Sequence, residues 1–96
     1  MKIIWSPLAL DRASEITKYI SIDNPTAAQK WVDNIFKQVD LLTDSPEIGR
    51  IVPEIDRKEI RELIFGNYRI IYRLEKTNIS ILTTRHCKQI LPTDEL

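Results

Sequence analysis

The spacing of apolar positions changes along the chain, and each change marks a different predicted element. The short β-branched run at residues 2–5 predicts a strand. Ser6 is a good helix N-cap and Pro7 a good first helical residue, so we expect a helix to begin there. Apolar residues then recur at intervals of four, three and four, which places them on one helical face: Ala9, Ala13, Ile16 and Ile20.

A second helix is predicted to follow almost at once. The sequence Asp23-Asn24-Pro25 repeats the signal of a cap followed by proline, so it ends the first helix and begins the second. Because the link is so short, we expect an antiparallel helical hairpin, which Ser45-Pro46 ends. The second helix carries the strongest periodic stripe in the chain: Ala28, Trp31, Val32, Ile35, Val39 and Leu42.

After an irregular segment at residues 45–57, the apolar period changes to two and predicts strands at residues 60–65, 68–74 and 78–86. Gly66-Asn67 is typical of a tight hairpin, and Lys76-Thr77 is a weaker turn signal. We therefore predict a single α+β domain over residues 1–96. In it the N-terminal strand and the helical hairpin pack on one face of a mainly antiparallel sheet, which ends in a three-stranded meander.

Two-residue turns between these strands would determine which side chains share a face. The helix-facing set is then Leu63, Phe65, Tyr68, Ile70, Tyr72, Leu74, Ile79 and Ile81. The opposite face carries Ile64, Arg69, Ile71, Arg73, Leu82, Thr84 and His86. Solvation alone does not require the aliphatic residues of this second set. We therefore expect the chain to leave that face bare for a partner protein.

Composition changes this picture little. Hydrophobic residues make up 43% and charged residues 29%, as in ordinary globular proteins, and no stretch predicts a membrane span or a secretory signal. The net charge is zero, but residues 1–49 carry five Lys/Arg against seven Asp/Glu and residues 50–91 carry nine against five. The basic half suits either a solvated sheet edge or an acidic partner. The single cysteine, Cys87, fits a reducing cytoplasm.

Several segments resemble toxins of the RelE/ParE superfamily, including plasmid-stabilisation proteins. They are residues 46–50, 61–63, 67–73 and 79–88, in this order of elements. The resemblance implies the RelE/ParE-like fold and a cytoplasmic, growth-inhibiting toxin of a type II toxin–antitoxin system, neutralised by a cognate antitoxin. ParE-branch toxins inhibit DNA gyrase by binding it, whereas RelE-branch toxins cleave mRNA in the ribosomal A site.

The residues favour the ParE branch. RelE-type ribonucleases supply lysines before a Tyr-Arg pair, the arginine of that pair, a second arginine after the last strand and a tyrosine near the C-terminus. Here the pair is Tyr68-Arg69, but the lysine positions fall on Ile60 and Glu62, and the second arginine falls on Lys88. A glutamate would repel a scissile phosphate. No tyrosine follows Tyr72, so an acid–base group of the family's kind is missing.

The resemblance thus implies a gyrase inhibitor with no catalytic residues. One alternative is a ribosome-dependent mRNA endoribonuclease that uses Arg69, His86 and Lys88, and another is a non-toxic relative that only binds a partner. Neither a cofactor nor a metal is expected, because no phosphate loop, zinc-ligand spacing or Ser–His–Asp set occurs. Whether the toxin forms a homodimer, or a heterotetramer with the antitoxin, is left open.

The candidate antitoxin- or target-binding residues lie in the C-terminal half. For Arg69, the competing interpretation is an ion pair with Glu62 on the neighbouring strand. For His86, the competing interpretation of a general base is a structural or surface role. The whole candidate set is Arg61, Ile64, Arg69, Ile71, Arg73, Leu82, Thr84, His86 and Lys88.

Overall fold

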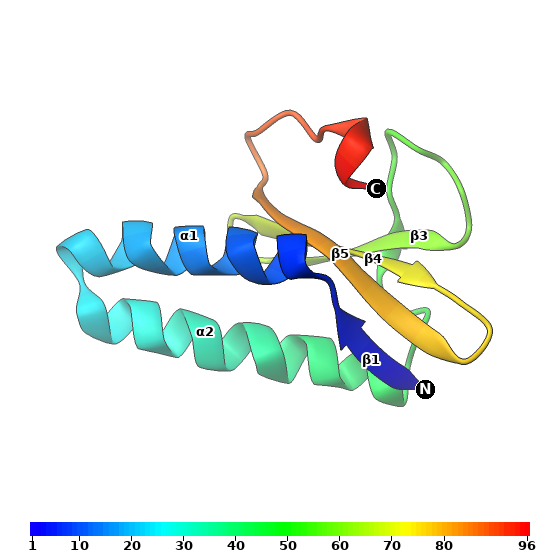
Figure 1. The fold of residues 1–96 in the computed structure, drawn as a ribbon, viewed down its shortest axis with the longest axis horizontal. Coiled ribbons are helices and arrows are strands. Elements are labelled where there is room, and N and C mark those ends of the chain that lie inside the picture. The colour runs from blue at the N-terminus through cyan, green and yellow to red at the C-terminus, as the bar shows by residue number, and fades with distance from the viewer.

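A helical hairpin lies against a five-stranded sheet in the computed structural model, which describes residues 1–96 (Figure 1). The sheet order is β1-β5-β4-β3-β2, with β1 parallel to β5 and every other pair antiparallel. The predicted α+β fold is confirmed, and the short strand β2 is an addition to it. The elements are β1 (Lys2–Trp5), α1 (Pro7–Asp23), α2 (Pro25–Asp40), the 3-10 helix η1 (Leu41–Thr43), β2 (Arg50–Ile51), β3 (Ile60–Phe65), β4 (Tyr68–Leu74), β5 (Asn78–His86) and the 3-10 helix η2 (Thr93–Glu95).

Side-chain caps determine where the two helices begin. Ser6 Oγ accepts a hydrogen bond from the Ala9 N–H at 3.0 Å, and the Asn24 side chain accepts one from the Ala27 N–H at 3.0 Å. The Asn24 backbone N–H also donates to the Ile20 carbonyl, so one residue ends α1 and begins α2. The predicted hairpin and the starts of both helices follow from this local chemistry, whereas α2 ends at Asp40, before the predicted stop at Ser45-Pro46, and continues as η1.

The main core fills the space between the helices and one face of the sheet. The predicted stripe is confirmed: Ala28, Trp31, Ile35 and Val39 of α2 and Leu42 of η1 are buried, and Val32 is partly buried. Trp31 packs edge-on against Tyr68, with ring centroids 5.3 Å apart. The buried residues of this cluster are Ala9, Trp31, Ile35, Val39, Leu42, Ile70, Tyr72, Ile79 and Ile81.

A β-bulge at Leu82 changes the faces of β5. Ile71 pairs with Thr83 and Tyr72 pairs with Ile81, so Leu82 has no opposite residue on β4. Beyond the bulge the alternation is shifted by one residue. The expectation that Thr84 and His86 lie opposite the helices is therefore wrong, because Thr84 pairs with Ile70 and His86 with Tyr68 on the helix face.

The face opposite the helices, here called the far face, is not bare. A second buried cluster forms there from Val52, Ile60, Ile71 and Leu91, with Ile55, Leu82 and Leu96 packed against it. The segment after β2 and the C-terminal segment, residues 91–96, supply the covering side chains, and Figure 1 shows the C-terminal turn on the side of the sheet away from the helices. The expectation of an uncovered face is therefore wrong. Of its aliphatic residues, Ile64 alone stays 49% exposed.

Tyr72 and Gly49 join the irregular segment to the sheet. The Tyr72 hydroxyl donates to the Pro46 carbonyl at 2.8 Å and accepts from the Gly49 N–H at 3.0 Å. A Cβ at Gly49 would lie 2.5 Å from the Tyr72 hydroxyl and 2.6 Å from the Glu62 carbonyl oxygen. A backbone carbonyl in a sheet cannot move aside cheaply, so this position requires glycine.

Gly49→Ala is therefore expected to lower the free energy of unfolding by about 1–3 kcal/mol through overpacking. Urea denaturation with matched m-values measures this change. Gly66→Asn is the control, because Gly66 has a positive φ but open space around it and asparagine tolerates that backbone conformation. Equal stability of Gly49→Ala and the unchanged protein would contradict the packing argument.

Candidate functional site

Arg69 lies in a buried cluster of charges on the far face. Its Nε donates to Glu62 at 2.5 Å, and its two terminal nitrogens donate to the two carboxylate oxygens of Glu54 at 2.6 and 2.9 Å. The Glu62 side chain has no exposed surface and also accepts from Arg50 Nε at 2.5 Å. The ion pair between Arg69 and Glu62, the competing interpretation of the sequence, is confirmed.

This pairing limits what Arg69 can bind. Arg69 is only 7% exposed, and the two arginines of the cluster are matched by two carboxylates. The hydrogen bonds that Arg69 donates to Glu54 lower the pKa of Glu54 to about 2, and the same bonds raise the pKa of Arg69 further above its usual range. A phosphate or a partner's carboxylate would have to displace these glutamates first.

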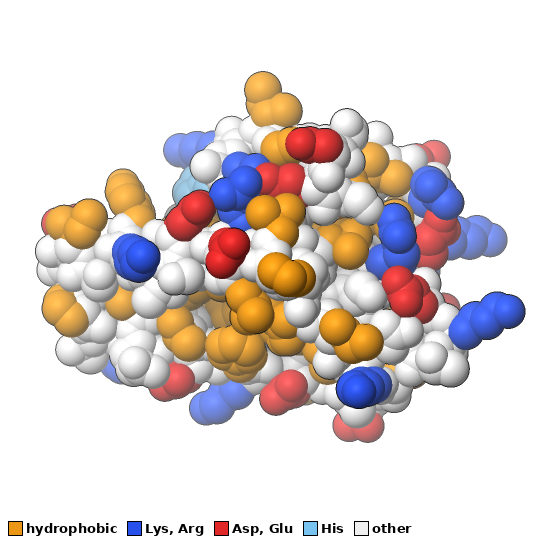
Figure 2. Space-filling model, viewed as in Figure 1, with side chains coloured by type: hydrophobic (Ala, Val, Ile, Leu, Met, Phe, Trp, Pro, Cys, Tyr) orange, Lys and Arg blue, Asp and Glu red, His pale blue; other side chains and the backbone are white.

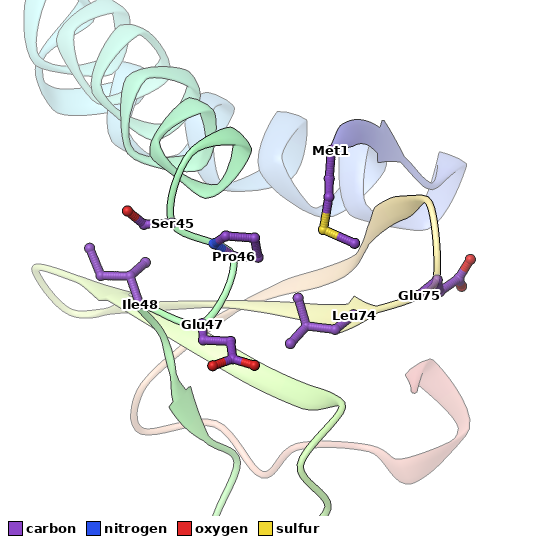
Figure 3. A pocket seen from close by; sticks show the side chains of 7 residues that line it. All are labelled: Met1, Ser45, Pro46, Glu47, Ile48, Leu74 and Glu75. Atoms are coloured by element: carbon purple, nitrogen blue, oxygen red, sulfur yellow. The ribbon is translucent and has the colours of Figure 1, made fainter.

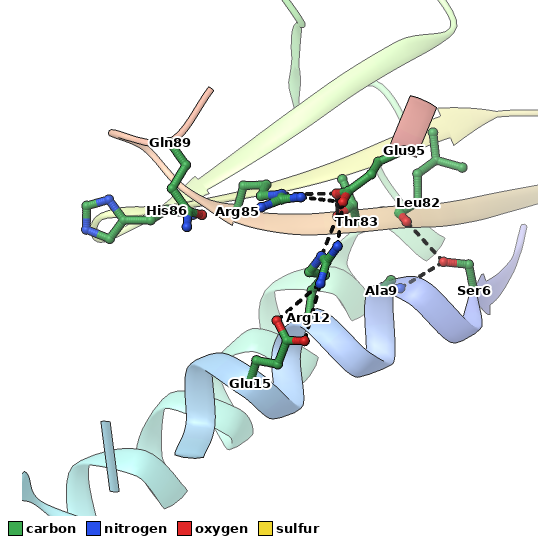
Figure 4. A network of polar contacts seen from close by, with 10 residues as sticks. All are labelled: Ser6, Ala9, Arg12, Glu15, Leu82, Thr83, Arg85, His86, Gln89 and Glu95. Carbon is green, nitrogen blue, oxygen red and sulfur yellow. Dashed lines mark hydrogen bonds and ion pairs between the residues drawn. The ribbon is translucent and has the colours of Figure 1, made fainter. Parts of the chain in front are cut away.

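A second charge cluster holds the C-terminal segment (Figure 4). The Glu95 carboxylate accepts from Arg12 at 2.7 Å, from Thr83 at 2.7 Å and from Arg85 Nε at 3.0 Å. Burial raises the pKa of Glu95, but the hydrogen bonds from Arg85, Arg12 and Thr83 outweigh it and bring the pKa to about 2. Near this cluster, the Leu96 backbone oxygen accepts from Arg73 at 2.9 Å.

Thr84 and His86 face a groove between α1 and the sheet, where β4 begins and β5 ends. The groove has a volume of about 590 Å³, and α1 lines it with Arg12, Ile16 and Tyr19. The Thr84 hydroxyl has no hydrogen-bond partner although the residue is only 1% exposed.

His86 is held at the edge of this groove by its neighbours. Its ring packs edge-on against Tyr68 at 5.2 Å, and its Nδ1 accepts from the Lys88 N–H at 3.1 Å. In the neutral ring Nε2 therefore carries the proton, so His86 presents a hydrogen-bond donor rather than a base. This arrangement weighs against the sequence-based idea of a general base.

The candidate binding residues separate into four groups. Ile71, Leu82, Arg69 and Arg73 lie on the far face under or beside the chain's own segments, whereas Thr84 and His86 lie on the helix side. Arg61 donates to the carbonyls of Lys58 and Gly49 and so holds the irregular segment. Ile64 and Lys88 are exposed. The three residues of the ribonuclease alternative, Arg69, His86 and Lys88, do not converge on one centre, because Arg69 and His86 are on opposite faces of the sheet.

Sequence reasoning missed the residues that organise these clusters. Arg12 and Glu95 are 83 positions apart, so no local spacing indicates their contact. Arg85 appears on the far face only once the bulge is known, and Glu54 lies in a segment without periodicity. Only the excess of basic residues after position 50 pointed toward acidic partners, and those partners include carboxylates of the chain itself.

A second depression lies at the other end of the molecule (Figure 3). It has a volume of about 620 Å³ and is lined by apolar side chains, Ser45 and the carboxylates of Glu47 and Glu75. No lysine, arginine or histidine lines it, so it offers no side-chain cation to hold a phosphate. No three His, Cys, Asp or Glu side chains are grouped to hold a metal ion, and no helix has the length and apolar character that crossing a membrane requires.

The carboxylates of the two charge clusters predict a loss of stability in acid. A carboxyl with a lowered pKa stabilises the fold fully above its unfolded value, here about 4.5, and that contribution disappears as pH falls toward about 2. Glu95→Gln should lower the unfolding free energy at pH 7 by about 1–3 kcal/mol and flatten this pH dependence. Urea denaturation at pH 7 and pH 3 tests both effects. Glu15→Gln, whose side chain is 64% exposed, is the control with little expected change.

Comparison with known proteins agrees with this fold. Residues 3–91 match the family model described as the ParE toxin of the type II toxin–antitoxin system parDE. The chain is 38% identical over 93 residues to "Putative toxin Y4kP" of Sinorhizobium fredii, covering 95% of this chain and 93% of that protein. The fold is similar to a solved structure described as the chromosomal ParDE TA system from P. aeruginosa. The TM-score is 0.76 and the identity 23%, over 92% of this chain and 97% of the solved one. The family match spans nearly the whole chain and confirms the branch that the sequence favoured, so this protein belongs to the ParE toxin family of type II toxin–antitoxin systems.

Proposed function

We propose that this toxin acts in the cytoplasm by binding and inhibiting DNA gyrase, and that a cognate antitoxin neutralises it. The observation that carries the choice of a binding mechanism is the pairing of Arg69 with Glu54 and Glu62. Arg69 occupies the one position that matches the RelE-type arginine, yet all three of its guanidinium nitrogens already donate to carboxylates. If Arg69 turned away to hold a phosphate, buried Glu62 would keep only Arg50 as a cation, at a high energetic cost.

His86 adds a second argument against RNA cleavage by the predicted residues. Its Nδ1 lone pair is occupied by the Lys88 N–H, and its ring lies across the sheet from Arg69. A general base and the cation that holds the scissile phosphate must contact the same substrate group, which this separation prevents. A toxin that acts by occupying a surface of its target needs no such convergence.

The proposed contacts with a partner protein, gyrase or the antitoxin, come from the candidate residues that are accessible. Ile64 projects from β3 at 49% exposure, and Lys88 is exposed beyond β5. His86, at the edge of the groove, is partly exposed. An aliphatic side chain with this exposure on a sheet is a suitable anchor for a partner protein, and an exposed lysine favours acidic partner residues.

Purified protein is expected to inhibit supercoiling by gyrase in a titratable way, and its induction in cells to give double-strand breaks and filaments. Because binding needs no acid–base group, and because Ile64 and Lys88 remain as contacts, His86→Ala should retain most of the inhibition. The parallel measurement maps mRNA ends at ribosomes in the same cells. Cut transcripts that disappear in His86→Ala would establish the ribonuclease alternative. If cells that lack the antitoxin show neither gyrase inhibition nor cut transcripts, the protein is a non-toxic relative that only binds a partner.

The open reading frame beside the gene is expected to encode the antitoxin, and its co-expression should restore growth. Ile64→Glu should weaken the purified complex at least about tenfold, because a charge would replace an apolar contact. Ile48→Glu is the matched control, since Ile48 is 56% exposed but lies outside the candidate set. Isothermal titration calorimetry measures both affinities. Equal affinities for the two variants would remove Ile64 from the interface.

A further inference from the structure

The depression at the end of the molecule away from the groove has apolar walls that face water (Figure 3). Its volume of about 620 Å³ lies within the usual range of binding pockets, roughly 300–1,000 Å³. Met1 is 42% exposed and Ile48 is 56% exposed, so the apolar surface is not covered by the chain itself. The apolar residues that line the depression are Met1, Pro46, Ile48 and Leu74.

The two carboxylates of the depression, those of Glu47 and Glu75, have no cation as a partner. The chain has seven glutamates, and the other five all form ion pairs: Glu15, Glu54, Glu59, Glu62 and Glu95. Glu75 accepts a hydrogen bond from the neutral Ser80 hydroxyl at 3.1 Å. The N-terminal ammonium of Met1 donates to the Thr43 carbonyl at 3.4 Å and pairs with neither glutamate. The depression therefore presents negative charge that the chain leaves unpaired.

This negative charge is a local feature of the surface. Figure 2 shows acidic and basic side chains interspersed over one face of the molecule, in keeping with the net charge of zero. Around Glu47 the balance is acidic, because residues 38–49 contain Asp40, Asp44 and Glu47 but no lysine or arginine. Lys2 and Lys76 adjoin the depression in the sequence, but neither lines it. The electrostatic potential inside it is therefore negative.

The occupant that matches both the walls and the charge is a lysine or arginine beside an apolar side chain. The long stem of either basic residue packs on apolar surface while its charged end reaches a carboxylate. A phosphate would meet two carboxylates and no side-chain cation. A metal ion alone would leave the exposed side chains of Met1 and Ile48 uncovered.

DNA gyrase is the partner whose own activity requires such basic side chains. An enzyme that holds DNA neutralises its phosphates, so the segments that contact DNA carry lysines and arginines. The antitoxin matches this end of the toxin less well. Residues 50–91 carry nine Lys/Arg against five Asp/Glu, so the basic half of the toxin attracts acidic residues of a partner instead.

We propose that the depression receives a basic, DNA-binding segment of gyrase. Lysines or arginines of this segment pair with Glu47 and Glu75, and its apolar atoms lie against Ile48 and Met1. This inference rests on the gyrase inhibition proposed above and adds the surface through which the toxin reaches its target. The carboxylates of the toxin then take the place of DNA phosphates on the enzyme.

Charge reversal at the two glutamates tests this contact. Glu47→Lys and Glu75→Lys should each raise the toxin concentration that half-inhibits gyrase supercoiling about tenfold, because like charges would then face one another. Ile48→Ser should also raise it, because the apolar contact is lost. All three side chains are exposed and outside ion pairs, so thermal unfolding should stay unchanged.

Asp23→Lys is the matched control for the charge reversals. It makes the same change of charge at an exposed residue, at the end of α1 that lies farthest from the sheet (Figure 1). Because Asp23 lies away from the depression, this variant should inhibit gyrase as well as the unchanged toxin does.

The affinity for the antitoxin, measured by isothermal titration calorimetry, separates the two partners. Glu47→Lys and Glu75→Lys should bind the antitoxin as tightly as the unchanged toxin. The proposal is overturned if both variants inhibit gyrase as well as Asp23→Lys does. It is also overturned if they lose antitoxin affinity instead, or if they only dissociate a homodimer. An unchanged toxin that does not inhibit gyrase would refute the proposed function itself, and this inference with it.

Discussion

The β-bulge at Leu82 is the constraint on which the two faces of this toxin depend. The Ser6 hydroxyl donates to the Leu82 carbonyl at 3.0 Å while it accepts from the Ala9 N–H, so the first turn of α1 is fastened to the bulge. The extra residue directs Thr83 and Arg85 toward the C-terminal segment and Thr84 toward the helices. Without the bulge, the carboxylate site for Glu95 and the open groove would exchange their side chains.

On the far face, the arginines of the sheet are paired with carboxylates of the same chain. Two arginines and two glutamates neutralise one another there, and one of them, Glu62, has no exposed side-chain surface. Ionised groups in such a site remain stable only as a complete set, because any missing partner leaves a charge without water around it. The same requirement that holds the fold together therefore prevents Arg69 from acting on a phosphate.

The two sides of the sheet consequently have different roles. The far face is covered largely by the chain itself, through aliphatic contacts of Leu91 and Leu96 and through the carboxylate of Glu95. The helix side keeps a groove whose charges cancel and whose Thr84 hydroxyl is unsatisfied.

The sequence by itself determined the helices, the hairpin of β3 and β4, the α2 stripe and the family, because caps, periodicity and the Gly66-Asn67 turn act over a few residues. It did not reveal β2, which consists of two residues inside an aperiodic segment. Nor did it reveal the bulge, since an apolar Leu82 is compatible with either register. Only the tertiary structure decided which face is covered and which arginines are paired. Those contacts join positions as distant as Arg12 and Glu95, and burial, which makes the pairing compulsory, exists only after the chain has folded.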